Sequence, residues 1–185
     1  MARRRARTGG MEPLTPRRKW MVITVATLLL APAFWAMLAG QLAFASDDSD
    51  VSEAAASAAI AFGLAVIPFV FMILAFGSGH PQAPGAVLKA MGLCLVVGIM
   101  VSAVAADAVT GVVAGVGAGG VVALRKDLPH DWRTRATAVA LAAAYAFVLA
   151  RTSSAMVVLS APVFPLTAIG MADHWSERRR RSIDQ

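Results

Sequence analysis

The amino-acid sequence predicts an all-α polytopic membrane protein, a compact bundle of six transmembrane helices, with four helices as the alternative. Of its 185 residues, 58% are hydrophobic and only 15% are charged, whereas about a quarter of the residues in a soluble domain are charged. The apolar residues form long blocks, as a helix needs to cross a bilayer core of about 30 Å. The basic residues gather beside these blocks, where they are typical of a topology signal.

The first block, residues 21–45, is apolar for 25 residues and contains Pro32. The basic motif before it and the Ala-Phe-Ala sequence at 43–45 resemble an export signal with a cleavage site. However, the apolar region of a signal peptide has only about 7–15 residues. We therefore expect an uncleaved first span. An acidic connector at 46–53 and a second span at 54–76 follow.

The block at 86–124 is too long for one crossing, because its 39 residues would form a helix of about 60 Å. Residues 136–172 present the same problem. We expect each block to hold two short helices joined by a tight turn, the alternative being one span with a re-entrant or interfacial piece. The predicted spans are 21–45, 54–76, 87–106, 108–124, 136–150 and 154–172.

Charge bias favours six spans over four. With six spans and both termini cytoplasmic, sixteen of the seventeen Lys and Arg residues lie inside and only Arg151 lies outside. Four spans would move the bases of 125–135 to the outside, against the positive-inside tendency. The bundle at 21–172 would then lie between basic cytoplasmic tails at 1–20 and 173–185. The Ala-, Gly- and Arg-rich composition is compatible with a bacterial genome, which predicts a multi-pass protein of the inner (plasma) membrane.

The basic ends of the chain predict contact with the lipid bilayer and its anionic headgroups. Nucleic acid is not expected as a partner, because the bases flank hydrophobic blocks. The residues expected to contact headgroups are Arg17, Arg18, Lys19, Arg178, Arg179, Arg180 and Arg181.

A glycine-rich segment predicts a helix-packing interface. Gly111, Gly115 and Gly119 are spaced by four residues, so they share one face of a helix and form two overlapping GxxxG patterns. Such a face lets another helix approach closely. We favour packing against a neighbouring span of the same chain over contact with a second subunit.

Asp107 and Arg151 are the only acid and the only base deep in the last two apolar blocks, apart from Lys89 near the start of the first of them. Charges at depth are costly and usually face a partner or a cavity. In the six-span arrangement both lie at outer turns, where they could form an intramembrane charge pair. The alternatives are turn residues that reach the interface and a gate or ion site. Interhelical hydrogen bonds, in preference to ligand contacts, are expected from the polar residues of the spans: Gln41, Ser102, Thr110, Tyr145, Ser153, Ser154 and Ser160.

The sequence offers no catalytic constellation, metal site or cofactor site. Its three histidines are scattered, without the spacing of metal ligands. The chain is therefore predicted to be a non-enzymatic accessory or scaffold subunit that packs through its glycine-rich face, with a membrane-protein partner or as a homo-oligomer. The alternative is a small-solute or ion transporter or channel that uses Asp107 and Arg151.

Overall fold

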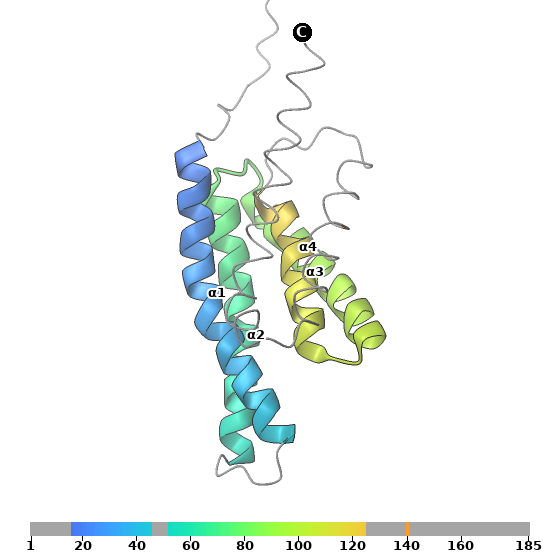
Figure 1. Ribbon diagram of the computed structural model, residues 1–185. Helices are drawn as coiled ribbons and strands as arrows, with labels where there is room; N and C mark the ends of the chain where they lie inside the picture. Colours follow the sequence, from blue (N-terminus) through green and yellow to red (C-terminus); the bar gives the residue numbers. More distant parts are fainter. Residues whose placement is uncertain (1–15, 46–51, 125–139, 141–185) are drawn as a thin grey trace, which may run out of the picture.

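The protein forms a helical bundle. The structure, a computed structural model, describes residues 16–45 and 52–124 together with Ala140. In order along the chain, α1 (Pro16–Ala45), α2 (Glu53–Gly77), α3 (Ala83–Ala105) and α4 (Ala108–Leu124) run alternately in opposite directions (Figure 1). The predicted all-helical bundle is thus confirmed for the described residues.

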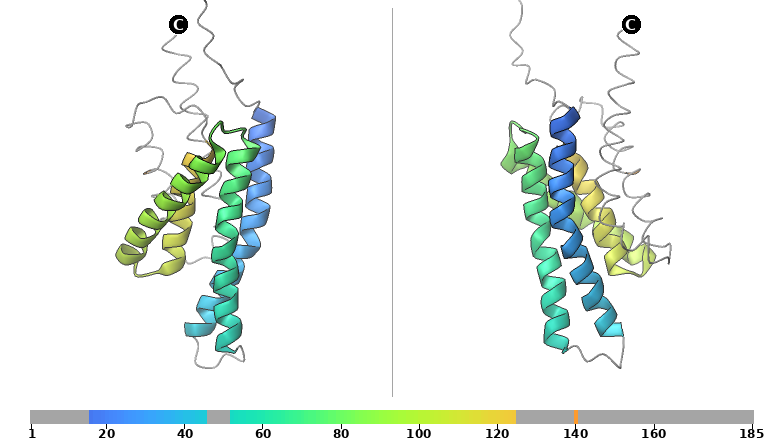
Figure 2. Two further views of the ribbon diagram at one scale, coloured as in Figure 1. Left: turned by 180° about the vertical axis from the view of Figure 1, so that it is seen from behind. Right: turned by 60° about the vertical axis from the view of Figure 1, so that its left-hand side comes forward.

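The four helices form two antiparallel hairpins. α1 packs along α2, α3 packs along α4, and α2 also contacts both helices of the second hairpin. Figure 2 shows the second hairpin beside the α1–α2 pair, with the α3–α4 turn well short of the end at which α2 begins. The start of α1, the end of α2, the start of α3 and the end of α4 lie at one end, which we call the basic end.

Three of these helices are long and apolar enough to cross a membrane: α1 from Arg17 to Ala45, α2 and α3. α4 is equally apolar but has 17 residues, about 26 Å at 1.5 Å per residue. The predicted fifth and sixth spans, 136–150 and 154–172, lie outside the described residues, so the total number of spans stays a prediction.

The first helix begins five residues earlier than the predicted span. α1 starts at Pro16 and includes residues 17–19, which the sequence had placed in the basic tail. Proline is favourable at the first helical position, and arginine and lysine are good helix formers. Further along α1, the hydroxyl groups of Thr24 and Thr27 each donate to the carbonyl four residues earlier, at 2.8 Å, which keeps them hydrogen-bonded within an apolar segment.

Both ends of α2 are capped. At its start the Ser52 hydroxyl accepts the Ala55 N–H at 3.2 Å, as expected for an N-cap. At its end the Arg18 side chain donates from Nε to the Gly77 carbonyl at 3.2 Å, and the buried Ser78 hydroxyl donates to the Ala75 carbonyl. The Arg18 contact also joins the beginning of α1 to the end of α2.

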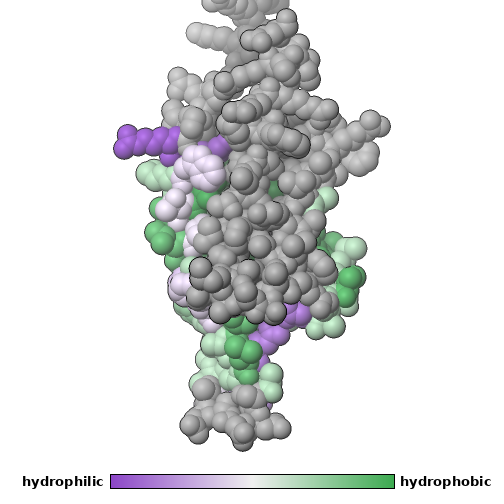
Figure 3. Space-filling model, in the orientation of Figure 1, coloured by the Kyte–Doolittle hydropathy of each residue, from purple (hydrophilic) through white to green (hydrophobic). Residues whose placement is uncertain are grey.

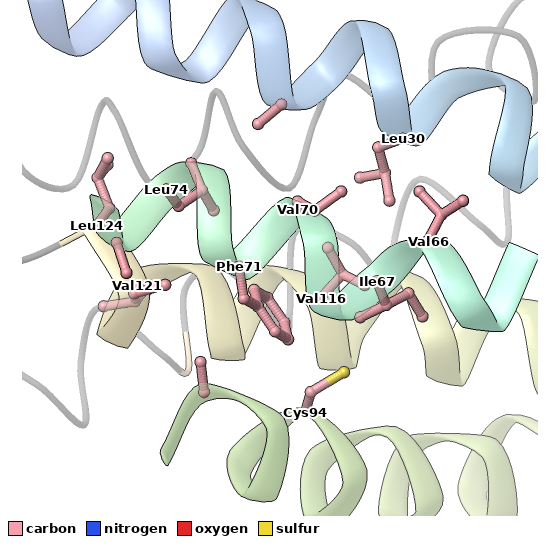
Figure 4. Close-up of a cluster of buried hydrophobic side chains, with 14 of the residues drawn as sticks. Leu30, Val66, Ile67, Val70, Phe71, Leu74, Cys94, Val116, Val121 and Leu124 are labelled. Atoms are coloured by element: carbon pink, nitrogen blue, oxygen red, sulfur yellow. The ribbon is translucent and has the colours of Figure 1, made fainter. Parts of the chain in front are cut away.

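The core lies where α2 meets the other helices. Leu30 of α1 and Val70, Phe71 and Leu74 of α2 are fully buried, and Figure 4 shows Phe71 pointing between α3 and α4, near Cys94. Outside this core, large apolar side chains of α1, α2 and α3 are exposed. Figure 3 shows apolar side chains along the described helices and a hydrophilic group at the basic end. Exposed apolar flanks of this extent are typical of a surface that is covered by lipid or by a partner.

Candidate functional site

The turn between α3 and α4 carries the most connected polar cluster that the structure describes. α3 ends at Ala105 and is capped by Ala106, which adopts the left-handed conformation with φ 51°. The Asp107 N–H donates to the Ser102 carbonyl at 3.3 Å. The chain therefore reverses within two residues, between Ala105 and Ala108. A left-handed residue at a helix end is a common way to stop a helix, although the position more often holds glycine. The block at 86–124 is thus two helices joined by a tight turn.

Asp107 is the N-cap of α4. Its Oδ1 accepts the Val109 N–H at 3.3 Å, and its Oδ2 accepts the Thr110 N–H at 3.1 Å. The Thr110 hydroxyl, fully buried, also donates to Oδ2. An aspartate here pairs N–H groups that the helix leaves unbonded and lies at the positive end of the helix dipole. The sequence had placed Asp107 at a turn, and the structure adds its capping role.

Gln41 connects this cap to α1. Its Nε2 donates to Asp107 Oδ1 at 3.0 Å, a bond between residues 66 positions apart that joins the two hairpins. The expected interhelical hydrogen bond of Gln41 is confirmed. Thr110 instead bonds within its own helix cap, to the residue three positions earlier. The other amide atom of this side chain, Gln41 Oε1, is buried and has no hydrogen-bond partner among the described residues. An unpaired buried oxygen is uncommon and is costly in free energy.

The surroundings of Asp107 favour its ionised form. Burial raises the pKa of the carboxyl group, but the hydrogen bonds from the Thr110 and Gln41 side chains and from the backbone N–H groups of Thr110 and Val109 outweigh burial. The pKa of Asp107 therefore lies below its ordinary value. The charge is stabilised by the chain itself, without an ion pair to any residue that the structure describes.

The position of Gln41 along α1 gives the distance of the cluster from the basic end of that helix. Gln41 lies 21 residues after Trp20, about 32 Å along the helix. This is close to the thickness of a bilayer core, about 30 Å. If Trp20 lies at one interface, where tryptophan is enriched, the Asp107 turn lies at the opposite one. Asp107 thus lies about one bilayer-core thickness from Trp20 along the direction of α1.

The glycine face of α4 lies against α3. A Cβ on Gly111 would collide with the Gly98 carbonyl oxygen, a Cβ on Gly115 with that of Cys94, and a Cβ on Gly119 with that of Ala90 at 2.6 Å. The three carbonyl groups are themselves spaced by four residues along one face of α3. α4 therefore rests directly on the α3 backbone, and its glycine face is occupied within the chain.

Further glycines, which the sequence analysis did not single out, set the spacing of α1 and α2. A Cβ on Gly40 would lie 2.6 Å from the Ala56 carbonyl oxygen, and one on Gly63 would lie 2.7 Å from that of Ala33. The available signal was a single glycine inside each long apolar span, facing an alanine of the other. Without a four-residue repeat, that signal did not stand out.

The basic residues predicted to contact headgroups are only partly described. Arg17 and Arg18 are exposed in the first turn of α1, whereas Lys19 is buried, with 6% of its surface exposed. The predicted partner of Asp107, Arg151, lies outside the described residues, as do the four arginines at 178–181.

The described fold and site define a class: an all-helical protein with three helices of membrane-spanning length, tightly packed on glycine, with a capped carboxylate at one turn. No protein-family model, no curated protein and no solved structure matches the chain. The residues of the chain itself are therefore the basis for its function.

Proposed function

We propose that the protein is a multi-pass integral protein of the plasma membrane and serves as a non-enzymatic accessory or scaffold subunit. The apolar character of α1, α2 and α3 supports the membrane location. So do large aromatic side chains on the outside of α2: Phe62 is 53% exposed and Phe76 is 55% exposed. In water these side chains would form an aggregation-prone surface, whereas in a bilayer they meet acyl chains or a partner helix.

The observation that carries the scaffold role is the engagement of the Asp107 carboxylate. Both of its oxygens accept hydrogen bonds from the chain itself, from α4 and from Gln41 of α1. A carboxylate held in this way fixes the start of one helix and joins two hairpins. The glycine face of α4 likewise holds α3. These residues support a rigid body, and a partner would then meet the outer apolar flanks.

The proposal is tested by site-specific photo-cross-linking in cells. A photoreactive amino acid replaces Phe62 or Phe76 on the exposed side of α2, and the fully buried Val70 provides the matched control. We expect one exposed position to give a discrete adduct with one membrane protein or with a second copy, and Val70 to give none. If both exposed positions give lipid adducts alone and the purified protein is a monomer, the scaffold role is wrong.

A second candidate function, solute or ion transport, has one observation in its favour. Gln41 Oε1 is buried beside Asp107 and is unpaired within the part of the chain that the structure describes. A buried oxygen without a protein partner is also found where an ion or a water molecule binds. In this alternative Asp107 acts together with Arg151. A flux in proteoliposomes that Asp107→Asn abolishes, with folding retained, would favour transport. Unchanged ion and solute fluxes would favour the scaffold.

A further inference from the structure

One flank of α3 combines an apolar surface with a single charge. α3 is the most exposed of the three helices of membrane-spanning length. Only 11% of its most apolar 18-residue stretch is buried, against 39% of the corresponding stretch in α1 and in α2. Lys89 is the one charged residue of this helix, and it is exposed. The exposed apolar side chains of α3 are Leu88, Leu95, Val96, Ile99, Met100 and Val104.

The surroundings of Lys89 leave room along the helix. Gly85 precedes it by four residues and Gly92 follows it by three, so both are its neighbours on the helix surface. A Cβ on either glycine would meet no atom within 4 Å. The lysine therefore stands in an open strip, and it forms no ion pair with any residue that the structure describes.

The direction of α3 brings the ammonium group towards the basic end. Helical side chains lean towards the N-terminus of their helix, and α3 begins at the basic end, where α1 also begins (Figure 1). Lys89 lies six residues after Ala83, about 9 Å along the axis. A lysine stem can bridge most of that distance, with its methylene groups against apolar surface and its charge at the interface.

We propose that this flank of α3 binds an anionic phospholipid, with Lys89 holding the phosphate headgroup and the strip from Gly92 to Ile99 receiving an acyl chain. The proposal rests on the membrane location proposed above. Charge complementarity selects the ligand: a zwitterionic headgroup carries its own cation and attracts Lys89 less than an anionic headgroup does. The groups on this flank follow the same order as the parts of a phospholipid. Lys89 lies on the side of the interface, as a headgroup does, and the exposed apolar residues lie deeper, as an acyl chain does.

Fluorescence quenching in bilayers tests the proposal at this one place. The full-length protein carries Cys94→Ala, so that a bimane dye attaches only to a cysteine introduced as Gly92→Cys. Brominated phosphatidylglycerol and brominated phosphatidylcholine are compared at the same mole fraction. The matched control is Phe69→Cys on α2, which is 58% exposed and lies eight residues from the basic end of its helix, against nine for Gly92.

At position 92 we expect the anionic lipid to bind about fivefold better than the zwitterionic one, equivalent to about 1 kcal/mol. The ratio of the two lipid affinities at position 92 should fall to near one in Lys89→Gln and persist in Lys89→Arg. At position 69 the same ratio should be near one in the protein with Lys89 intact. A ratio that is equal at the two positions, or that survives Lys89→Gln, overturns the proposal and leaves the membrane location standing. If neither lipid quenches either dye, the membrane location and the lipid site are both wrong.

Discussion

Replacing Gly115 by alanine is expected to destabilise the α3–α4 hairpin. The added Cβ would collide with the Cys94 carbonyl oxygen and would lie 3.1 Å from the Cys94 sulfur. A side chain can rotate away from such a contact, but a backbone carbonyl moves only if the two helices move apart. The closely packed positions at Gly111 and Gly119 would then lose contact as well.

The magnitude follows from two opposing effects. Alanine is favoured over glycine inside a helix by about 0.5–1 kcal/mol, whereas overpacking a well-packed interface costs about 1–3 kcal/mol. Because the obstacle is backbone, we expect a net loss of about 1–2 kcal/mol. For a chain of this size that lowers Tm by about 2–8 °C. At Gly92, where a Cβ meets no atom within 4 Å, alanine should leave Tm unchanged or raise it.

Thermal unfolding of the detergent-purified protein, followed by tryptophan fluorescence, measures this difference between Gly115→Ala and Gly92→Ala. Light scattering after size-exclusion chromatography gives the oligomeric mass of each variant in parallel. If Gly115→Ala unfolds at the wild-type temperature and lowers the oligomeric mass, the glycine face lies between subunits. Packing of α4 against α3 within the chain would then be refuted.

Three further variants test the polar cluster and the core. Gln41→Ala should cost about 0.6 kcal/mol, the average for interhelical hydrogen bonds in membrane proteins, and at most about 1.7 kcal/mol. In an Asp107→Ala background it should cost nothing more, as a double-mutant cycle on unfolding would show. The pKa of Asp107 is lowered in the folded state. The ionised carboxylate therefore contributes its full stabilisation at pH values above the pKa of Asp107 in the unfolded chain, and this stabilisation is lost as the pH falls through the pKa of Asp107 in the folded protein. Asp107→Asn should remove this loss and flatten the acid side of a plot of Tm against pH. Phe71→Ala should cost about 3–5 kcal/mol, since the ring is fully buried, whereas Phe69→Ala on the exposed side of α2 should change Tm little.

Hydropathy predicted two of the described helices closely, because the apolar character of a span is a local property of the sequence. The predicted spans 54–76 and 108–124 lie within one residue of α2 and α4. The break near Asp107 followed from an acid in the middle of a block too long for one crossing. The early start of α1 at Pro16 was missed, because the predicted span was counted from the first residue of the apolar block. The basic residues before that block are good helix formers and extend the helix.

The contacts of the site depended on tertiary structure and were harder to predict. Gln41 was recognised as a hydrogen-bonding residue, but no local pattern relates it to a residue 66 positions away. The repeat at Gly111, Gly115 and Gly119 predicted a close helix contact, without indicating that α3 carbonyl groups would fill it. Gly63 belongs to no such repeat and was missed. Its contact with the Ala33 carbonyl follows from the way α1 and α2 pack, which the local sequence does not show.

The central claim is that α3 crosses the membrane between the α2–α3 connector and the Asp107 turn. Cysteine accessibility in intact cells tests it most directly, with Gln82→Cys and Ala108→Cys introduced singly on a Cys94→Ala background; both positions are exposed. With a membrane-impermeant maleimide added outside, we expect position 108 to react and position 82 to react only after the membrane is opened. Reaction of both positions from the same side in intact cells would contradict the claim.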